Sequence, residues 1–336
     1  MRPLICVPNR FLKKGTMFSI YITKIIIFSF IILYLSTAYA KTLYVVNQGG
    51  AVNIIDLSSE RTVKEIPAGR DSINLLLDPS GHYMVVGNGE EEGKIWILDR
   101  TTEKIIAKIP VMKGATAGFP FFVFSKDGTK FFAVTRYSPE LYIIGAGDWR
   151  LLKTVPLDLA PEGLEISQDG KFLYIINRKD PNLVIFNIIT EKVERTIELG
   201  VNPSSIVASP DGKTLYIADK GDSKILILDS SSFKALKKIT VGTEPVDMAI
   251  TKDGRFLYVS CRFSYSLVVI DTLEMRSVAN IPVGIFPWGV ALNNDGTEAY
   301  VANYNENTVS IIDLKKQREV YRLPTGVFPT KVLFVP

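Results

Sequence analysis

Histidine and cysteine are nearly absent from this 336-residue chain, which contains one histidine, His82, and two cysteines, Cys6 and Cys261. A single histidine cannot supply the ligand sets typical of zinc sites, and no Cys-x-x-Cys-His motif is present for covalent attachment of a c-type haem. A Ser-His-Asp triad would have to use His82, which follows Ser80-Gly81 with no nucleophile elbow nearby. We therefore predict no catalytic residue and no metal site. Enzymatic activity stays uncertain, with a non-enzymatic role favoured.

The chain after residue 40 also lacks any convincing 3.6-residue hydrophobic period, so the sequence predicts no long amphipathic helix. What recurs instead is an Asp-Gly pair followed by a short apolar strand. The pairs are Asp127-Gly128, Asp169-Gly170, Asp211-Gly212, Asp253-Gly254 and Asp295-Gly296, with Ser80-Gly81 as a degenerate copy; the last four spacings are each 42 residues. A period of about 40 residues with several short strands is the pattern of a β-propeller.

The number of repeats and the two ends of the chain predict how the ring is built. The strand after each turn occurs seven times, with equivalent residues Tyr44, Val85, Phe132, Tyr174, Tyr216, Tyr258 and Tyr300. Lys41 falls in register just after a turn and Pro336 just before one, so the first blade lacks its innermost strand. Residues 326–336 should supply that strand, because an open sheet edge leaves backbone groups unpaired.

Each repeat contains four short apolar runs separated by Gly, Pro, Asn, Asp and Ser, which is typical of strands joined by turns. In the repeat 200–241 we expect strands at 205–208, 214–218, 225–228 and 236–241. The prediction is an all-β protein: a single seven-bladed β-propeller of four-stranded antiparallel blades over residues 41–336. The ring is closed by the C-terminal strand, which completes the first blade.

The first 40 residues differ in composition from the repeats. They contain five basic residues and no acidic one, then an apolar run at 25–35, then Ala38-Tyr39-Ala40. This pattern predicts a secretory signal peptide cleaved after Ala40, and hence a periplasmic or secreted protein. Met17 is an alternative start that gives a segment of more ordinary length. The competing interpretation is an uncleaved anchor, although the apolar run is shorter than the ~20 residues that span a bilayer.

Removal of this segment changes the charge of the protein. The five basic residues of 1–40 leave 34 of the 39 in the repeats, against 35 acidic residues. A net charge near zero indicates no nucleic-acid partner, and membrane contact is expected only through the N-terminal segment if it is kept. Cys261 would be the single remaining cysteine, so no intramolecular disulfide can form, and we expect it to be a small buried residue. We predict a monomer.

The repeat unit resembles the YVTN-type β-propeller family. It runs Gly-x-x-Pro, apolar strand, Ser-Pro-Asp-Gly-Lys-x-Leu-Tyr-Val-Ala-Asn, then Val-x-Ile-Asp; residues 200–229 are a close copy, and 287–313 carry Tyr300-Val301-Ala302-Asn303. The resemblance covers essentially all of 41–336 and includes YncE-like exported proteins, surface-layer proteins and the haem d1 domain of cytochrome cd1 nitrite reductases. It implies the fold; because these relatives differ in function, it is a weak guide to chemistry.

One face of such a ring is the candidate binding surface. The inner strand of each blade runs from the top face to the bottom, which places the Asp-Gly turns at the bottom and the Gly-x-x-Pro loops at the top. Residues after the second strand would present cations from four consecutive blades: Arg136, Arg178, Lys220 and Arg262, followed by Tyr304. The loops before the inner strands would add Phe119, Glu162, Glu244, Asp247, Phe286, Trp288 and Phe328. A basic arc opposite aromatic rings suits an anionic ligand, because arginine binds carboxylate and phosphate bidentately.

Two structural interpretations compete with binding. The long cationic side chains could instead cap the top face, pair with Glu162, Glu244 or Asp247, and bind nothing. A second recurring set ends the third strand of each blade: Asp56, Asp99, Asn187, Asp229, Asp271 and Asp313. Asp and Asn in such positions accept hydrogen bonds from backbone amides two residues on, so we interpret this set as holding tight turns.

Three functions are compatible with these patterns. The favoured one is an exported, non-enzymatic binding or scaffold propeller that recognises a protein, a glycan or a small anionic ligand at the top face. The alternative, implied by the resemblance to haem d1 and amine dehydrogenase domains, is a redox-associated propeller that binds or transfers a tetrapyrrole or quinone-type cofactor. The cations would then hold its carboxylates. A hydrolase with a metal on Glu162 and Asp247 has no support from spacing.

Overall fold

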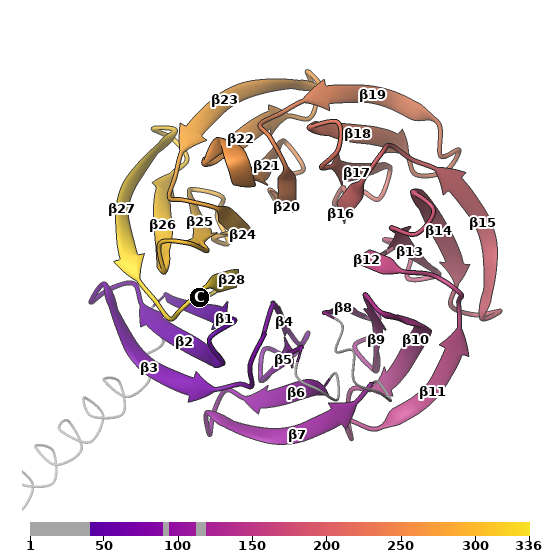
Figure 1. Cartoon of the computed structure of the whole chain (residues 1–336), viewed down its shortest axis with the longest axis horizontal. Coiled ribbons are helices and arrows are strands. Elements are labelled where there is room, and N and C mark those ends of the chain that lie inside the picture. Colours follow the sequence, from indigo (N-terminus) through magenta and orange to yellow (C-terminus); the bar gives the residue numbers. More distant parts are fainter. Residues whose placement is uncertain (1–40, 90–93, 112–118) are drawn as a thin grey trace, which may run out of the picture. The chain divides into compact units, whose positions relative to one another are not determined.

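Seven four-stranded sheets form a closed ring around a central channel in the computed structural model, which describes residues 41–89, 94–111 and 119–336 (Figure 1). Every pairing within a sheet is antiparallel, and six sheets use four consecutive strands. The seventh has the order β28-β1-β2-β3 and joins the two ends of the ring. The predicted all-β, seven-bladed propeller is therefore confirmed, and the sheets are called blades 1 to 7 from that one onward.

The strands occupy four positions from the channel outward. The inner strands are β28 (Pro329–Val335), β4 (Asn74–Leu77), β8 (Pro120–Phe124), β12 (Pro161–Ile166), β16 (Pro203–Ala208), β20 (Pro245–Ile250) and β24 (Pro287–Leu292). The second strands are β1 (Thr42–Asn47), β5 (Tyr83–Gly87), β9 (Lys130–Thr135), β13 (Phe172–Asn177), β17 (Thr214–Asp219), β21 (Phe256–Cys261) and β25 (Glu298–Asn303). The third strands are β2 (Ala51–Asp56), β6 (Lys94–Asp99), β10 (Ser138–Gly145), β14 (Asn182–Asn187), β18 (Lys224–Asp229), β22 (Ser266–Asp271) and β26 (Thr308–Asp313). The outer strands are β3 (Arg61–Pro67), β7 (Lys104–Pro110), β11 (Leu151–Pro156), β15 (Lys192–Glu198), β19 (Ala235–Thr240), β23 (Arg276–Pro282) and β27 (Arg318–Pro324).

The recurring turns have the conformations that their residue types favour. The glycine of each Asp-Gly pair has a positive φ, between +68° and +73° in the five copies, which glycine adopts without steric cost. The preceding aspartate accepts hydrogen bonds inside the turn; Asp211 Oδ1, for example, is 2.6 Å from Ser209 Oγ and 3.1 Å from the Lys213 amide. Because inner strands end at these turns, all of them lie on one face of the ring, which we call the bottom.

The C-terminal strand closes the ring as the register of the repeats predicted. β28 pairs with β1 from Thr42–Val335 to Asn47–Pro329. Thr330 is fully buried, and its hydroxyl lies 3.2 Å from the Val46 carbonyl oxygen and 3.1 Å from that of Ser72. The hydrogen bond to Ser72 reaches the next blade, so β28 contributes to the joint between blades 1 and 2 as well as to its own sheet.

The hydrophobic core lies between neighbouring blades and not within a single layer. One cluster joins Tyr44 and Val52 of blade 1 to Met84 and Leu98 of blade 2, and six similar clusters follow around the ring. Residues of the second and third strands are almost all buried, whereas those of the outer strands are largely exposed. Alternate side chains of a strand point to opposite faces, so each blade packs against both of its neighbours.

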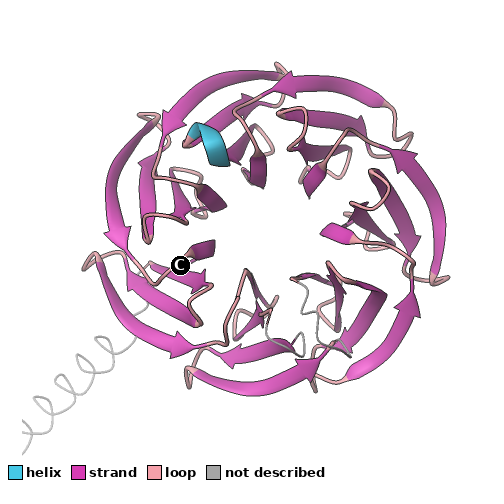
Figure 2. Ribbon diagram, viewed as in Figure 1, coloured by secondary structure: helices cyan, strands magenta, loops and turns pink. Residues whose placement is uncertain are grey.

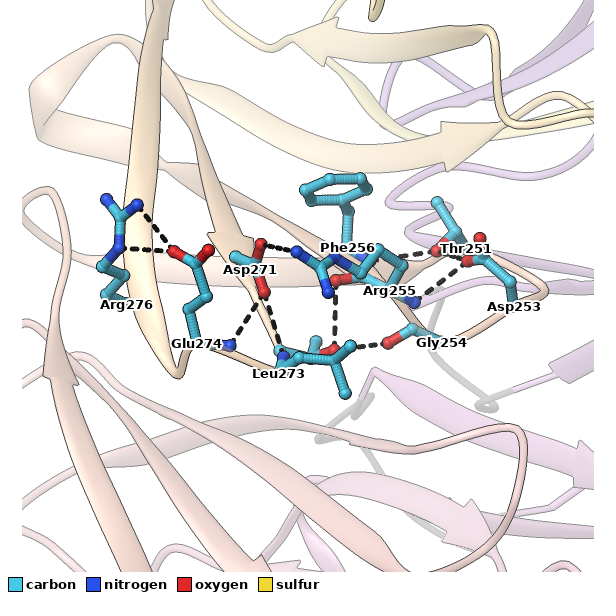
Figure 3. A network of polar contacts seen from close by, with 10 residues as sticks. Thr251, Asp253, Gly254, Arg255, Phe256, Asp271, Leu273, Glu274 and Arg276 are labelled. Atoms are coloured by element: carbon cyan, nitrogen blue, oxygen red, sulfur yellow. Dashed lines mark hydrogen bonds and ion pairs between the residues drawn. The ribbon is translucent and has the colours of Figure 1, made fainter.

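The aspartate that ends the third strand of a blade connects two turns of that blade, as Figure 3 shows for Asp271 in blade 6. Asp271 Oδ1 accepts hydrogen bonds from the backbone amides of Leu273 (3.0 Å) and Glu274 (2.9 Å), and Arg255 forms an ion pair with Asp271 Oδ2. Arg255 itself follows the Asp253-Gly254 turn, and its amide lies 3.0 Å from Asp253 Oδ1. The column of aspartates is thus structural, in line with the interpretation from sequence.

These turns predict loss of stability in acid. Hydrogen bonds from the Ser232 amide and from the Ser231 and Ser232 hydroxyls lower the pKa of Asp229 to about 2 from its usual 3.8. Hydrogen-bonded turns also lower the pKa of Asp56, Asp99, Asp127, Asp169, Asp211, Asp253, Asp271, Asp295 and Asp313. A pKa that is lower in the folded state stabilises the fold above the unfolded pKa, and that contribution is lost as pH falls through the folded pKa.

We therefore expect the denaturant midpoint to be flat above pH 5 and to fall between about pH 4 and pH 2. Asp229→Asn should keep the turn, because Asn187 holds the equivalent turn with its amide oxygen. That variant should show a shallower acid dependence than the wild type. If the denaturant midpoint of Asp229→Asn falls with pH as steeply as that of the wild type, Asp229 has the same pKa in the folded and unfolded chains.

The only helix in the described ranges is a short 3-10 turn, η1 (Arg262–Ser264), shown in cyan in Figure 2. It was not expected from sequence. The turn forms after β21, where Ser264 Oγ accepts a hydrogen bond from the Thr243 amide at 2.6 Å and the Phe263 amide donates to the Thr243 carbonyl. Over the same described ranges, no helix is long and apolar enough to cross a membrane.

Candidate functional site

Glu162 brings together three of the cations predicted from sequence. It is the second residue of β12 in blade 4 and is 5% exposed. Its Oε1 is 2.6 Å from Arg136 Nη2 of blade 3 and 3.3 Å from Lys220 Nζ of blade 5, and Arg178 Nε of blade 4 is 3.8 Å from Oε2. The cations come from loops after three consecutive second strands, so their side chains converge at the top of the channel.

The charges around Glu162 are only partly compensated. One carboxylate faces three cations, and burial lowers the pKa of the Lys220 ammonium although Glu162 opposes this shift. Two buried atoms in this group, Glu162 Oε2 and Arg136 Nε, have no hydrogen-bond partner in the described residues. The side chain of Arg178 is 46% exposed, the most accessible of the three. A negatively charged ligand could therefore reach Arg178 without first breaking a short ion pair.

A second carboxylate, Asp247, connects inner strands on the other side of the channel. It lies on β20 of blade 6, and its Oδ2 is 2.6 Å from Lys331 Nζ on β28 of blade 1. The same oxygen accepts a hydrogen bond from the Val290 amide of blade 7 at 3.0 Å. Asp247 therefore connects the inner strands of blades 6, 7 and 1, as Glu162 connects cations of blades 3, 4 and 5.

Aromatic side chains occupy the part of the top face near blades 6, 7 and 1. Arg262 forms an ion pair with Glu244 at 3.4 Å, and its guanidinium carbon lies 5.0 Å from the Trp288 ring and 5.9 Å from the Phe286 ring. Trp288 packs against Tyr304 with ring centroids 5.2 Å apart, and Tyr304 stacks on Phe328 at 4.9 Å. The Tyr304 hydroxyl donates to Gln48 Oε1 at 2.5 Å, which fixes the ring next to blade 1.

The channel holds a cavity of about 280 Å³ lined by inner-strand residues of all seven blades. Glu162, Asp247, Trp288 and Lys331 line it, together with Glu165, whose pKa is raised by burial although the nearby Lys126 opposes the shift. Pockets for small molecules are commonly about 300–1,000 Å³. The cavity is thus at the small end of that range, and polar groups of both signs line it.

The ten residues predicted for this face are all found on it, in two groups. Arg136, Arg178, Lys220 and Glu162 form one group, and Arg262, Phe286, Trp288, Tyr304, Phe328 and Asp247 belong to the other side. Arg262 departs from the expected arrangement, because it lies among the aromatic rings and not in the arc around Glu162. The ion pairs of these cations to Glu162 and Glu244 that the capping interpretation expected are present, whereas Asp247 pairs with Lys331 and with none of the four predicted cations. Whether a ligand also binds here stays a prediction.

Sequence reasoning missed Lys331 and Glu165. Lys331 lies 84 residues after Asp247, which is two repeats of 42, so the column of inner-strand residues contained the signal. Glu165 alternates with apolar residues on β12, and nothing in the local pattern distinguishes a channel-facing carboxylate from an exposed one. The other residues excluded from the site behave as expected: His82 is exposed at a bottom turn, and Cys261 is fully buried.

Comparison with protein families gives two matches. The model of the seven-bladed β-propeller lactonases matches residues 74–232, 190–272 and 231–324, which together span more than half of the chain. The model of the cytochrome D1 haem domain matches residues 26–119. The chain therefore belongs to the seven-bladed β-propeller lactonase family and is related to haem d1 domains. No curated protein matches the chain significantly.

Solved structures confirm the fold over most of the chain. Hydrazine synthase of Kuenenia stuttgartiensis is 20% identical, with a TM-score of 0.72, over 81% of this chain and 92% of that one. The periplasmic gluconolactonase PpgL of Pseudomonas aeruginosa is 17% identical, with a TM-score of 0.72, over 88% and 99%. The dihydro-heme d1 dehydrogenase NirN is 15% identical, with a TM-score of 0.66, over 87% and 74%. Such low identities show the fold alone.

A haem d1 group, which the family match implies, does not fit the residues of this face. Histidine is the usual ligand of a haem iron in such proteins, and the single histidine of the chain lies at a bottom turn. Cys261 is buried, and the Tyr304 hydroxyl is bound to Gln48. The described residues also contain no group of three or more His, Cys, Asp or Glu that could hold a metal ion.

Proposed function

We propose that this protein is an exported binding module that recognises a small anionic ligand at the top of its central channel. The proposal rests mainly on one observation: three cations share one buried carboxylate, Glu162. The ion pairs around the channel mouth join five cations to three carboxylates, Glu162, Glu244 and Asp247, so these ion-paired groups have a surplus of positive charge. An anion with two or more oxygens suits the forked guanidinium of the accessible Arg178.

The aromatic side of the site supports a ligand that carries a ring or an apolar part. Tyr304 stacks on Phe328 and contacts the tilted ring of Trp288 beside the channel, and Phe328 is 42% exposed. Aromatic rings provide contact area for such a part, while the cations on the other side hold the charge. The small volume of the cavity favours a ligand that rests mainly on the channel mouth and inserts only one group.

Binding fits the residues better than catalysis does. Among the described residues the mouth contains no nucleophile held by a base, and Glu162, Glu244 and Asp247 are engaged by cations or by a backbone amide. Because the chain belongs to the lactonase family, lactone hydrolysis is the competing function that has to be tested. Export is supported by the composition of residues 1–40, and one structural relative is described as periplasmic. If the purified protein hydrolyses glucono-δ-lactone, the protein is an enzyme and the proposed binding function is wrong.

The test begins with native mass spectrometry and an absorption spectrum of the protein purified from its own host. We expect a bound adduct that is lost after denaturation and has no strong visible absorbance. Titration calorimetry with citrate and with inorganic phosphate then gives affinities for defined anions. A bare mass together with no heat from either anion would overturn the proposal. A coloured adduct of several hundred daltons would favour the cofactor function.

Substitution of Arg178 should weaken anion binding and leave the fold intact. A hydrogen bond to a charged group contributes about 1.5–3 kcal/mol, so Arg178→Ala should weaken binding by about tenfold or more. Arg136→Ala and Arg262→Ala should also weaken it, with a larger cost in stability because their guanidinium groups are more buried. Calorimetry and thermal melting separate the two effects.

Lys179 offers a matched control for this series. It is the neighbour of Arg178, its side chain is 57% exposed, and it pairs with Asp158 at 3.5 Å and not with Glu162. Lys179→Ala should bind anions as the wild type does. If it weakens binding as much as Arg178→Ala does, the effect is one of general charge and the site is not specific. Wild-type affinity in all three arginine variants would contradict the proposed ligand contacts.

A further inference from the structure

A larger cavity lies away from the channel, at the bottom face between blades 4 and 5. It measures about 670 Å³ and is formed by two Asp-Gly turns, by β15 and by the turn between β18 and β19. Its walls include Phe172, Tyr174 and Phe233, and its rim includes Gln168 and Ser231. The volume is within the range of about 300–1,000 Å³ that is common for small-molecule sites.

The cavity coincides with a break in a repeated contact between blades. At two other joints, a cation of one outer strand pairs with a glutamate at the turn of the next blade: Lys64 with Glu103 and Lys153 with Glu191. The second pair is separated by 38 residues, and the same spacing leads from Arg195 to Phe233. Phe233 has the same backbone conformation as Glu191, with φ of +57° against +54°. An aromatic ring thus replaces the carboxylate at this joint.

The replacement leaves Arg195 without a carboxylate. Its guanidinium carbon lies 5.6 Å from the centre of the Phe233 ring, and no ion pair with it is found in the described residues. The guanidinium has five N–H donors and contacts a ring that offers no oxygen acceptor, so it keeps donors available to a ligand. Arg195 lines the cavity.

The wall of the cavity also contains a tyrosine hydroxyl that has no hydrogen-bond partner among the described residues. Tyr174 is 5% exposed, its ring contacts Phe233 edge-on at 6.2 Å, and burial raises the pKa of its hydroxyl. The equivalent hydroxyl of Tyr300 donates to Glu298 at 2.7 Å, whereas the hydroxyls of Tyr174 and of the equivalent Tyr258 make no hydrogen bond to the described residues. This hydroxyl is therefore available to donate a hydrogen bond to a ligand in the cavity and to accept one from it.

We propose that this cavity is a second binding site, specific for a neutral saccharide of one or two rings. A sugar ring has a face of C–H groups that can pack on Phe233 and Tyr174, and hydroxyl groups that can bond to the Tyr174 hydroxyl and to Arg195. The carboxylates at the rim, Asp169, Asp211 and Glu194, supply acceptors for further hydroxyls. Three carboxylates against one arginine disfavour a strong anion, and the pairing of Asp169 with Lys171 and of Asp211 with Lys213 disfavours a simple cation. The site is separate from the channel mouth and does not depend on the function proposed there.

The test uses residues 41–336 and three defined probes: maltose, cellobiose and N,N′-diacetylchitobiose, each at millimolar concentration. Saturation-transfer difference NMR should show transfer to the ring C–H protons of at least one of them. Phe233→Glu introduces the residue type found at two other joints and should form an ion pair with Arg195, as Glu191 does with Lys153. We expect this variant to melt within a few degrees of the wild type and to lose at least tenfold in affinity for the same sugar.

Met275 provides the control, because it occupies the same turn position in the next blade and has φ of +49°. Met275→Glu places the same carboxylate 38 residues after Lys237 and should leave sugar binding unchanged. Phe233→Ala, which creates no ion pair, should also lose the transfer signal if the ring contacts the sugar. The proposal is wrong if none of the three sugars gives a transfer signal with the wild type, or if Phe233→Glu binds the responsive sugar as tightly as the wild type does.

Discussion

Deletion of residues 326–336 is expected to abolish folding, giving an insoluble chain or one without a cooperative melting transition. The deletion removes β28, and with it the partner of β1 along the whole length of that strand. It also removes Val332 and Phe334 from the core between blades 7 and 1. Each buried side chain of this size contributes about 1.5–3 kcal/mol, and a domain is stable by only about 5–15 kcal/mol in total. The exposed edge of β1 would in addition favour aggregation.

Two point variants separate loss of packing from loss of the strand. Phe334 is 9% exposed, and its ring stacks on that of Tyr300 at 5.6 Å and 7°, so Phe334→Ala should cost about 3–5 kcal/mol. Val327 precedes the strand and is 51% exposed, so Val327→Ala should have little effect on unfolding. Chemical denaturation measures both. A soluble truncated protein with a single sharp transition would contradict closure by β28 as the source of stability.

Glu162→Gln is expected to have opposite effects on stability and on anion binding. The substitution keeps the shape of the side chain but removes the negative charge that three cations share. Removal of one partner from a buried ion pair is costly, and with cations that are partly exposed we expect a loss of about 2–4 kcal/mol. The same change removes the internal competitor for those cations, so affinity for citrate or phosphate should rise by about tenfold.

Glu244→Gln is the matched control for this experiment. Within the described part of the chain Glu244 forms an ion pair with one cation, Arg262, at 3.4 Å, so its loss should cost less stability and should raise anion affinity less. Denaturation and calorimetry on the two variants give both quantities. If Glu162→Gln binds anions more weakly than the wild type, Glu162 contacts the ligand directly. The view of it as an internal counter-ion would then be wrong.

Most of the fold was predictable because a propeller repeats local rules. The alternation of residues in β17 and β18, and the turn at Asp211-Gly212, depend on neighbours within a few positions, and a 42-residue period repeats them. Errors in one repeat are corrected by the others. The structure added η1 at Arg262–Ser264, which depends on a contact of Ser264 with Thr243 that no local pattern reveals.

The site was predictable only as a set of positions. Counting residues after the second strands places Arg136, Arg178 and Lys220 at one height. It does not say that all three would converge on Glu162, since that depends on the distance between blades and on side-chain torsions. Arg262 illustrates the limit: its position in the column is equivalent, but its guanidinium lies against Trp288.

The amino-acid sequence by itself determined the number of blades, the direction of every strand and the closure at β28, because these depend on hydrophobic period, turn residues and register. Tertiary structure alone decided which charges meet. It brought Lys331 to Asp247, and it left Arg195 facing Phe233 beside a cavity. Such contacts join segments of different blades across the ring, and their geometry arises only when seven similar sheets pack together. The functions proposed here depend on those contacts and not on the repeat itself.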